Sequence, residues 1–167
     1  MLKSALEENH KDIHQWFLMH QECLLLGHGH YAQASLEAFT ELLTAHMAFE
    51  NSHLLASGAE TEFGRMRWAA SVYLHEHEKI LQLVAAVERL FSRWHAEERS
   101  RSRRLLLLEL LERQLTLRHV IEHHEQREEQ DLFELIAETS AEWRQVEELL
   151  LGHAALKREI ADFLTRS

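Results

Sequence analysis

The sequence predicts an all-α protein, an antiparallel up-down four-helix bundle with an additional C-terminal helix. The 167 residues include no proline and only 5 glycines, whereas the tight turns of an all-β fold normally use both. Apolar residues make up 46% of the chain, which is enough to fill a core. Between short breaks these residues recur at intervals of three and four, the spacing of an amphipathic helix. The length fits one domain, residues 1–167.

Four breaks divide the chain into five segments with helical spacing. The breaks lie at 27–30, 57–64, 97–102 and 139–140. The expected helices span, in order, about 4–26, 31–56, 65–97, 103–138 and 141–165. Apolar residues on one face support each helix, in the same order: Leu6 and Ile13, Leu36 and Phe39, Val84 and Val87, Leu110 and Leu117, and Val146 and Ile160.

The character of the breaks explains why the helices end there. The first two contain glycine, the third is a charged run in which the apolar periodicity stops, and the fourth offers Thr139 and Ser140 as helix N-caps. Short connections join antiparallel neighbours. We therefore expect the first four helices to form the bundle, with the fifth packed outside it or against another subunit.

Charge and cysteine content limit the partners and the compartment. Acidic residues outnumber basic ones by 28 to 18, for a net charge of −10, and such a chain repels the phosphates of nucleic acid. Cys23 is the only cysteine, so no internal disulfide forms and a reducing compartment is expected. The first eight residues are acidic and lack an apolar signal core, and no stretch has the length needed to cross a bilayer. We expect a soluble cytoplasmic protein with neither nucleic acid nor membrane as a partner.

Histidine is unusually frequent, with 14 residues, although it is a mediocre helix former whose special roles are metal ligation and proton transfer. His46 with Glu50, and His124 with Glu128, share the spacing His-x-x-x-Glu. Side chains at this spacing lie on one helical face, about 6 Å apart. Chance alone gives about two such pairs in a chain with 14 histidines and 28 acidic residues, so the spacing by itself is weak evidence.

The level of these histidines in the bundle is stronger evidence. Two residues of antiparallel neighbours meet when they are equally far from the turn that joins their helices. The midpoint of His14 and His46 is residue 30, in the first break, and the midpoint of His46 and His77 is 61.5, in the second. The midpoint of His77 and His124 is 100.5, in the third. Each helix therefore brings one histidine to a single level. His10 gives a midpoint of 28 with His46, also in the first break, so His10 stays open beside His14.

The next level carries Glu50 and Glu128, with Tyr73 at the same level of the third helix. Burying two carboxylates without compensation costs several kcal/mol each, and divalent or trivalent cations supply that compensation. Two metal ions bridged by Glu50 and Glu128 and capped by histidines are the arrangement that needs the fewest further groups. Imidazole and carboxylate ligands without thiolate suit iron or manganese better than copper(I) or a structural zinc site.

Over about 10–136 the chain resembles the hemerythrin-like (HHE cation-binding) family. The motifs that carry the resemblance are His46-x-x-x-Glu50-Asn51-x-x-Leu54-Leu55, Glu76-His77-Glu78-Lys79-Ile80, His123-His124-x-x-Arg127-Glu128-Glu129-x-x-Leu132-Phe133 and, more loosely, Ile13-His14-Gln15-Trp16-Phe17. The resemblance implies a four-helix bundle that holds two iron ions joined by an oxo or hydroxo bridge. It implies as metal ligands His14, His46, Glu50, His77, His124 and Glu128.

The chain departs from the oxygen carriers of that family at Tyr73, where they have a second histidine. This departure argues against simple reversible oxygen carriage and leaves three roles for Tyr73: a ligand of ferric iron, a hydrogen-bond donor to bound peroxide, or a packing residue. The leading hypothesis is a di-iron protein that binds or senses dioxygen, peroxide or nitric oxide at an open iron position. The alternatives are a di-iron enzyme that processes peroxide or nitric oxide, and a metal-free, histidine-rich interaction protein.

Two further interpretations of the same region are weaker. Glu50-x-x-His53 and Glu7-x-x-His10 have the Glu-x-x-His spacing of ferritin-like di-iron bundles, but the third and fourth helices lack a counterpart. Glu76 is expected to orient a neighbouring group or, with slightly more weight, to face solvent. We rank the ferritin-like arrangement below the hemerythrin-like one.

Overall fold

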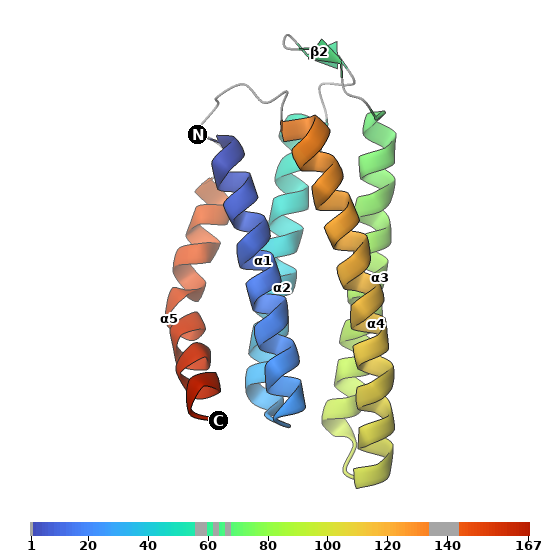
Figure 1. Cartoon of the computed structure of the whole chain (residues 1–167), viewed down its shortest axis with the longest axis vertical. Helices are drawn as coiled ribbons and strands as arrows, with labels where there is room; N and C mark the ends of the chain where they lie inside the picture. The colour runs from blue at the N-terminus through green and yellow to red at the C-terminus, as the bar shows by residue number, and fades with distance from the viewer. Residues whose placement is uncertain (1, 56–59, 62–63, 66–67, 134–143) are drawn as a thin grey trace.

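The computed structural model is helical along nearly all of the described chain (Figure 1), which confirms the predicted all-α class. It describes residues 2–55, 60–61, 64–65, 68–133 and 144–167. The α-helices are α1 (Leu2–Leu25), α2 (Gly29–Phe49), α3 (Ala70–Ala96), α4 (Ser100–Arg127) and α5 (Arg144–Arg166). Single π-helical turns continue α2 and α4, namely η1 (Glu50–Leu54) and η2 (Glu128–Leu132).

The boundaries differ from the prediction mainly at the start of the third helix. That helix was expected from residue 65 but begins at Ala70, because residues 64–65 form a short strand instead. Strand β2 (Gly64–Arg65) pairs antiparallel with β1 (Glu60–Thr61). The predicted break at 139–140 lies outside the described residues, as does the predicted end of the fourth helix.

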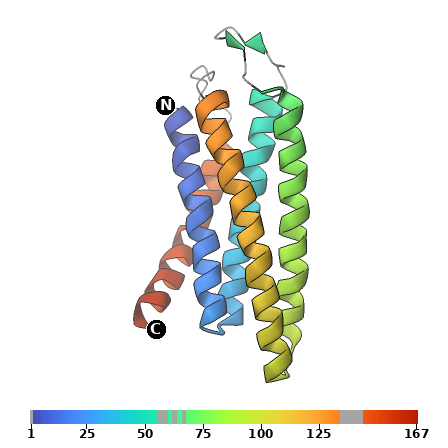
Figure 2. The same cartoon turned by 45° about the vertical axis from the view of Figure 1, so that its right-hand side comes forward.

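The first four helices lie side by side along the long axis of the molecule, and consecutive helices run in opposite directions (Figures 1 and 2). α1 packs mainly on α2, and α3 packs mainly on α4. The bundle region thus consists of two helical hairpins, α1–α2 and α3–α4. The fifth helix lies against α1 and α2.

A tight turn at residues 26–28 closes the first hairpin. Gly27 has φ of 72°, the left-handed conformation that commonly ends a helix and that glycine adopts without strain. The N–H of His28 reaches back to the carbonyl of Cys23 at 2.9 Å, and the His28 side chain accepts from the N–H of Tyr31 at the start of α2. This turn fixes the relative height of α1 and α2.

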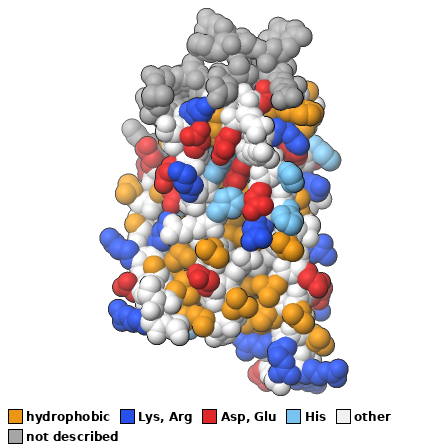
Figure 3. Space-filling view, in the orientation of Figure 1, with side chains coloured by type: hydrophobic (Ala, Val, Ile, Leu, Met, Phe, Trp, Pro, Cys, Tyr) orange, Lys and Arg blue, Asp and Glu red, His pale blue; other side chains and the backbone are white. Residues whose placement is uncertain are grey.

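Within the described part of the chain, the core is apolar apart from two main polar places and single buried polar groups such as Ser35 and Asp131. Large buried side chains such as Trp16, Phe39 and Trp94 fill the space between the helices. Figure 3 shows that, on the face formed by α1 and α4, exposed hydrophobic side chains gather in the lower half and charged and histidine side chains in the upper half. Among the described residues, none of the helices combines the length and the apolar character that crossing a bilayer requires.

One of the two polar places in the core is His20 on α1. Its Nδ1–H donates to the carbonyl of Ala32 at 2.6 Å, and its Nε2 accepts from the side-chain amide of Gln114 at 2.8 Å. These bonds join α1 to α2 and to α4. Burial lowers the pKa of His20 to about 4, so the ring is neutral in the folded protein at neutral pH.

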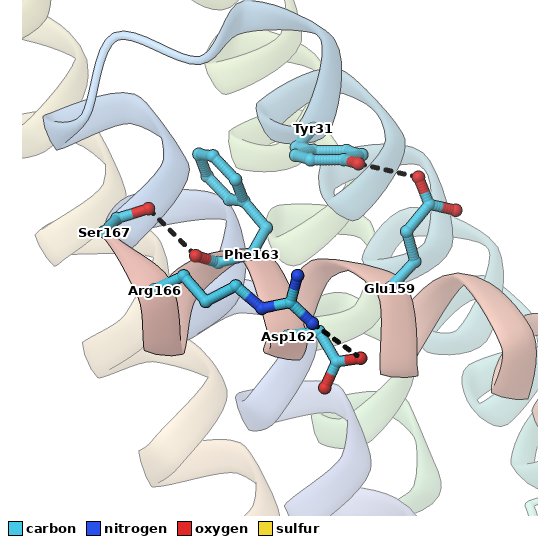
Figure 4. Close-up of a pocket in the computed structure, with 6 residues that line it drawn as sticks. All are labelled: Tyr31, Glu159, Asp162, Phe163, Arg166 and Ser167. Carbon is cyan, nitrogen blue, oxygen red and sulfur yellow. Dashed lines mark hydrogen bonds and ion pairs between the residues drawn. The ribbon is translucent and has the colours of Figure 1, made fainter.

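The fifth helix is attached through both apolar and polar contacts. Val146 and Ile160 are buried, and Lys157 pairs with Asp12 of α1 at 2.6 Å. Figure 4 shows the far end of this contact, where the hydroxyl of Tyr31 donates to Glu159 at 2.6 Å beside a surface pocket. The helix therefore packs outside the first four helices of its own chain, one of the two predicted placements.

The neutral state of His20 predicts a loss of stability in acid. Its pKa is about 4 in the folded protein against 6.5 for an unperturbed histidine, so the unfolded chain binds one more proton between these values. The free energy of unfolding therefore falls as the pH falls from 6.5 to 4, by up to about 3 kcal/mol from this group. Urea unfolding of the metal-free protein at several pH values should give a shallower pH dependence for His20→Gln than for wild type.

The control for this experiment is His75→Gln, because His75 is exposed. It should keep the pH dependence of the wild type. Equal slopes for wild type and His20→Gln would contradict the assignment of a neutral, buried His20.

Candidate metal centre

The second polar place in the core contains four histidines and two glutamates. Each of α1, α2, α3 and α4 supplies one histidine, and each π-helix supplies its first residue. The six residues are His10, His46, Glu50, His77, His124 and Glu128. All six are buried, and the two glutamates have no exposed surface.

These six residues form two groups that share both carboxylates. One group contains His10 and His46, the other contains His77 and His124, and each includes Glu50 and Glu128. Within each group the candidate ligand atoms lie within 4.8 Å of one another. Two imidazoles and two carboxylates at such distances could hold a metal ion.

The imidazole Nε2 atoms point at the carboxylates. Nε2 of His46 lies 3.1 Å from Oε1 of Glu50, and Nε2 of His77 lies 3.4 Å from Oε2 of Glu50. Nε2 of His124 lies 2.7 Å from Oε1 of Glu128, and Nε2 of His10 lies 3.5 Å from Oε2 of Glu128.

Despite these short distances, none of the four carboxylate oxygens receives a hydrogen bond from the described residues. Buried carboxylates without donors are costly unless a cation compensates them. The donor set therefore fits a metal centre.

The other ring nitrogen of each imidazole, Nδ1, donates a hydrogen bond to a partner outside the six residues. Nδ1 of His46 bonds Oδ1 of Asn9 at 2.8 Å, and Nδ1 of His77 bonds Oδ1 of Asn51 at 2.7 Å. The carboxylates of Glu129 and Glu76 accept from Nδ1 of His10 and His124, at 3.0 and 3.1 Å. Since these oxygens can only accept, Nδ1 carries the hydrogen and the Nε2 lone pair faces inward, as in histidines that bind metals.

This orientation brings lone pairs face to face. Nε2 of His10 is 3.1 Å from Nε2 of His46, and Nε2 of His77 is 2.9 Å from Nε2 of His124. Two neutral imidazoles with Nδ1–H cannot bond each other through Nε2, because neither has a hydrogen there. Each pair needs a cation between or beside its two nitrogens, either a proton or a metal ion.

The pKa values have the directions that such a centre requires. Burial opposes the charged form of His10, but its contacts with Glu128 outweigh burial and raise its pKa to about 9. The pKa values of His77 and His124 are raised for the same reason. Burial alone would raise the pKa of Glu128, but the neighbouring histidines, with His124 first, lower it well below its usual value. Protons thus supply the positive charge when no metal ion does.

The two hairpins build the centre by the same pattern. In the first helix of each, the residue before the histidine bonds the histidine of the second helix. In the second helix, the residue after the glutamate bonds the histidine of the other hairpin's first helix. The first hairpin supplies Asn9-His10 and His46, Glu50 and Asn51; the second supplies Glu76-His77 and His124, Glu128 and Glu129. The centre is therefore built with an approximate twofold relation between the hairpins.

The π-helical turns belong to this pattern, since each begins at a shared glutamate. The N–H of Leu55 bonds the carbonyl of Glu50 at 2.9 Å, and the N–H of Phe133 bonds that of Glu128. Single π-helical turns within α-helices occur frequently at functional sites. Here the wider turn directly follows the carboxylate that both groups share.

The structure brings together five of the six residues predicted from the sequence, but not His14. The Nε2–H of His14 donates to Glu125 at 2.5 Å, which raises the pKa of His14, and His14 belongs to neither group. His10 takes its place. The turn between α1 and α2 occupies residues 26–28. The midpoint of His10 and His46, residue 28, lies in this turn, whereas the midpoint of His14 and His46, residue 30, lies inside α2.

Tyr73 is buried, but its hydroxyl points to another group. It donates to Oδ2 of Asp131 at 2.7 Å, and the same oxygen accepts from the N–H of Trp68 at 3.1 Å. Burial raises the pKa of Tyr73 above its usual value, which disfavours the phenolate that would bind ferric iron. Neither group of candidate ligands includes Tyr73.

Sequence reasoning missed the outer ring of partners. Glu76, expected with slightly more weight to face solvent, bonds His124 and also pairs with Arg127. Asn9, Asn51 and Glu129 were not singled out. Their signal in the sequence is the parallel between Asn9-His10 and Glu76-His77, and between Glu50-Asn51 and Glu128-Glu129. The rival ferritin-like residues, Glu7 and His53, belong to neither group.

Comparison of the chain with protein-family models, with curated proteins and with solved structures finds no match. The resemblance to hemerythrin-like proteins is therefore carried by the sequence motifs alone. The chemistry of the site must be argued from the six buried residues and their partners.

Proposed function

We propose that this chain is a hemerythrin-like, non-haem di-iron protein that binds or senses a small oxidant: dioxygen, peroxide or nitric oxide. The observation that carries the proposal is the pair of carboxylates, Glu50 and Glu128, which two groups of histidines share and which accept no hydrogen bond from any described residue. The four histidines fall into two groups, so two ions, one in each group, would use every imidazole.

The number of donors supports an open position. Each group offers two imidazole nitrogens and two shared carboxylates, a nitrogen and oxygen set that suits iron or manganese. Sites of this kind keep positions open for small ligands. When bound, a pair of ferrous ions would supply electrons for the reduction of an oxidant.

The contribution of the protein is orientation and exclusion of water. Asn9, Asn51, Glu76 and Glu129 fix the direction of each imidazole through Nδ1, which holds Nε2 toward the centre. Phe133 stacks on the ring of His10, with centroids 5.4 Å apart. Such a shell keeps the ligands in place whether or not an oxidant is bound.

The two alternatives receive less support. The enzymatic alternative was motivated by Tyr73, but its hydroxyl donates to Asp131 rather than toward the two groups. The metal-free alternative leaves the facing Nε2 atoms to be separated by protons alone. Its pH-responsive groups would then be buried carboxylate–imidazole pairs, an arrangement that also favours metal binding.

The first prediction concerns metal content. After reconstitution with ferrous iron, the protein should bind about two irons per chain and show the absorption of an oxo-bridged diferric centre on exposure to air. Glu50→Gln and Glu128→Gln should each lose most of this absorption, because each removes a carboxylate that both groups use. Elemental analysis with optical spectra, before and after air and peroxide, measures both effects. Wild-type protein without iron after supplementation would contradict the proposal.

The second prediction separates His10 from His14. His10→Ala should weaken metal binding by at least about tenfold, since it removes an inward-facing imidazole. His14→Ala should keep the full metal content at equilibrium, because His14 belongs to neither group. Competition with a chelator of known affinity measures both variants. The reverse order of effects would restore His14 as the ligand.

The third prediction is proton release on metal binding. At pH 7 the metal-free His10 carries a proton, since its pKa is about 9, and a metal ion must displace it. The apparent metal affinity should therefore rise with pH between 6 and 9. Chelator competition across this range, and calorimetry in buffers of different ionisation enthalpy, measure the released protons. An affinity that does not change with pH would mean that protons and metal do not compete for this centre.

A further inference from the structure

The approximate twofold relation between the hairpins makes two faces of the molecule comparable. It relates the α1–α4 face to the α2–α3 face. His14 lies four residues after His10, and its equivalent, four residues after His77, is Leu81. Glu125 follows His124, and its equivalent, following His46, is Met47. At the same depth, one face therefore has an imidazole and a carboxylate where the other has two apolar side chains.

The polar pair reaches from the surface toward the centre. The side chain of His14 is 34% exposed, and its Nε2 lies 2.5 Å from Oε2 of Glu125, across the contact between α1 and α4. Glu125 is only 8% exposed. Its second oxygen, Oε1, is buried and receives no hydrogen bond from the described residues. A carboxylate oxygen in this state calls for a cation.

Two more carboxylates extend this pair along the same side, Glu122 on α4 and Glu129 on η2. Glu122 lies three residues before Glu125 and shares its face of α4, and Glu129 lies four residues after it, where η2 continues the helix. Glu122 and Glu129 are exposed, and Glu129 also accepts from Nδ1 of His10. Figure 3 shows histidine and acidic side chains together in the upper half of this face.

The opposite face lacks all three charges. The equivalents of Glu122, Glu125 and Glu129 on α2 and η1 are Thr44, Met47 and Asn51. Met47 is buried. The difference is not needed to hold the metal ions, because each group has the same four kinds of ligand on either side.

We propose that the α1–α4 face is the entrance through which metal cations reach the buried centre, and that Glu125 and His14 bind a divalent transition-metal cation in transit. This inference rests on the proposed metal-binding function. A row of carboxylates raises the local concentration of cations, and a carboxylate with an imidazole is a suitable donor pair for such ions. The position of Glu125, next to His124 in the chain, places this pair directly beside the second group.

The experiment measures the rate of metal uptake by the full chain. Metal-free protein is mixed with cobalt(II) in a stopped-flow spectrometer, and the absorbance of the bound ion is followed. The double variant His14→Leu/Glu125→Met copies the residues of the opposite face. It should take up cobalt about tenfold more slowly, or slower still, yet reach the same final metal content and spectrum as wild type. Glu125→Gln, which keeps the shape of the side chain, should also slow uptake.

The matched control is Glu78→Gln, which removes an exposed carboxylate from α3 and should leave the rate unchanged. Uptake at the wild-type rate by folded Glu125→Gln and by the double variant would overturn the entrance. A parallel loss of rate and final occupancy would also overturn it, because the pair would then be structural or ligating. If the double variant does not fold, as judged by circular dichroism, Glu125→Gln decides. Wild-type protein that takes up no metal would overturn the proposed function itself, a result distinct from unchanged rates.

Discussion

The constraint on which the structure depends is the burial of Glu50 and Glu128 in an apolar bundle, two carboxylates that receive no hydrogen bond from the part of the chain that the structure describes. Each costs several kcal/mol unless positive charge lies beside it. Protonated imidazoles beside the carboxylates supply that charge, or bound metal ions would supply it in their place. This single requirement explains why every one of the first four helices carries a buried histidine at one level. It also explains why His10, His77 and His124 have raised pKa values despite their burial.

The helical class and most of the centre could be predicted because both depend on simple periodicities. Apolar residues at helical spacing define the helices, and equal distance from a turn brings His46, His77 and His124 together. The spacing could not decide between His10, which lies in a candidate group, and His14, because the two lie one turn apart and the break at 27–30 is wide enough for both midpoints. The rule itself has a tolerance of about one turn, since side chains lean toward the N-terminus of their helix. The midpoint of His77 and His124 falls within α4, yet their Nε2 atoms are 2.9 Å apart.

The outer partners could not be predicted in the same way, because they depend on contacts between helices rather than on spacing within one. Asn9 reads as an ordinary polar residue of an N-terminal helix, and only the position of His46 on the neighbouring helix gives it a role. The parallel between the hairpins can be recognised only once the structure shows which histidine each outer partner bonds. Asn51 and Glu129 follow their glutamates at the same offset and bond histidines of opposite hairpins.

The two hairpins meet through the apolar core and through this centre. α1 packs mainly on α2 and α3 mainly on α4, while each group of ligands combines two histidines of one hairpin with a carboxylate from each. Cations bound there would tie the hairpins together, and metal binding would then be coupled to the packing of the bundle. Holding a pair of ions requires both halves to contribute equally, and the ligands accordingly repeat. Access of cations to the proposed centre requires only one face, the α1–α4 face. A second polar route would expose the carboxylates to water. This explains why the buried Met47 stands on the α2–α3 face at the position equivalent to Glu125.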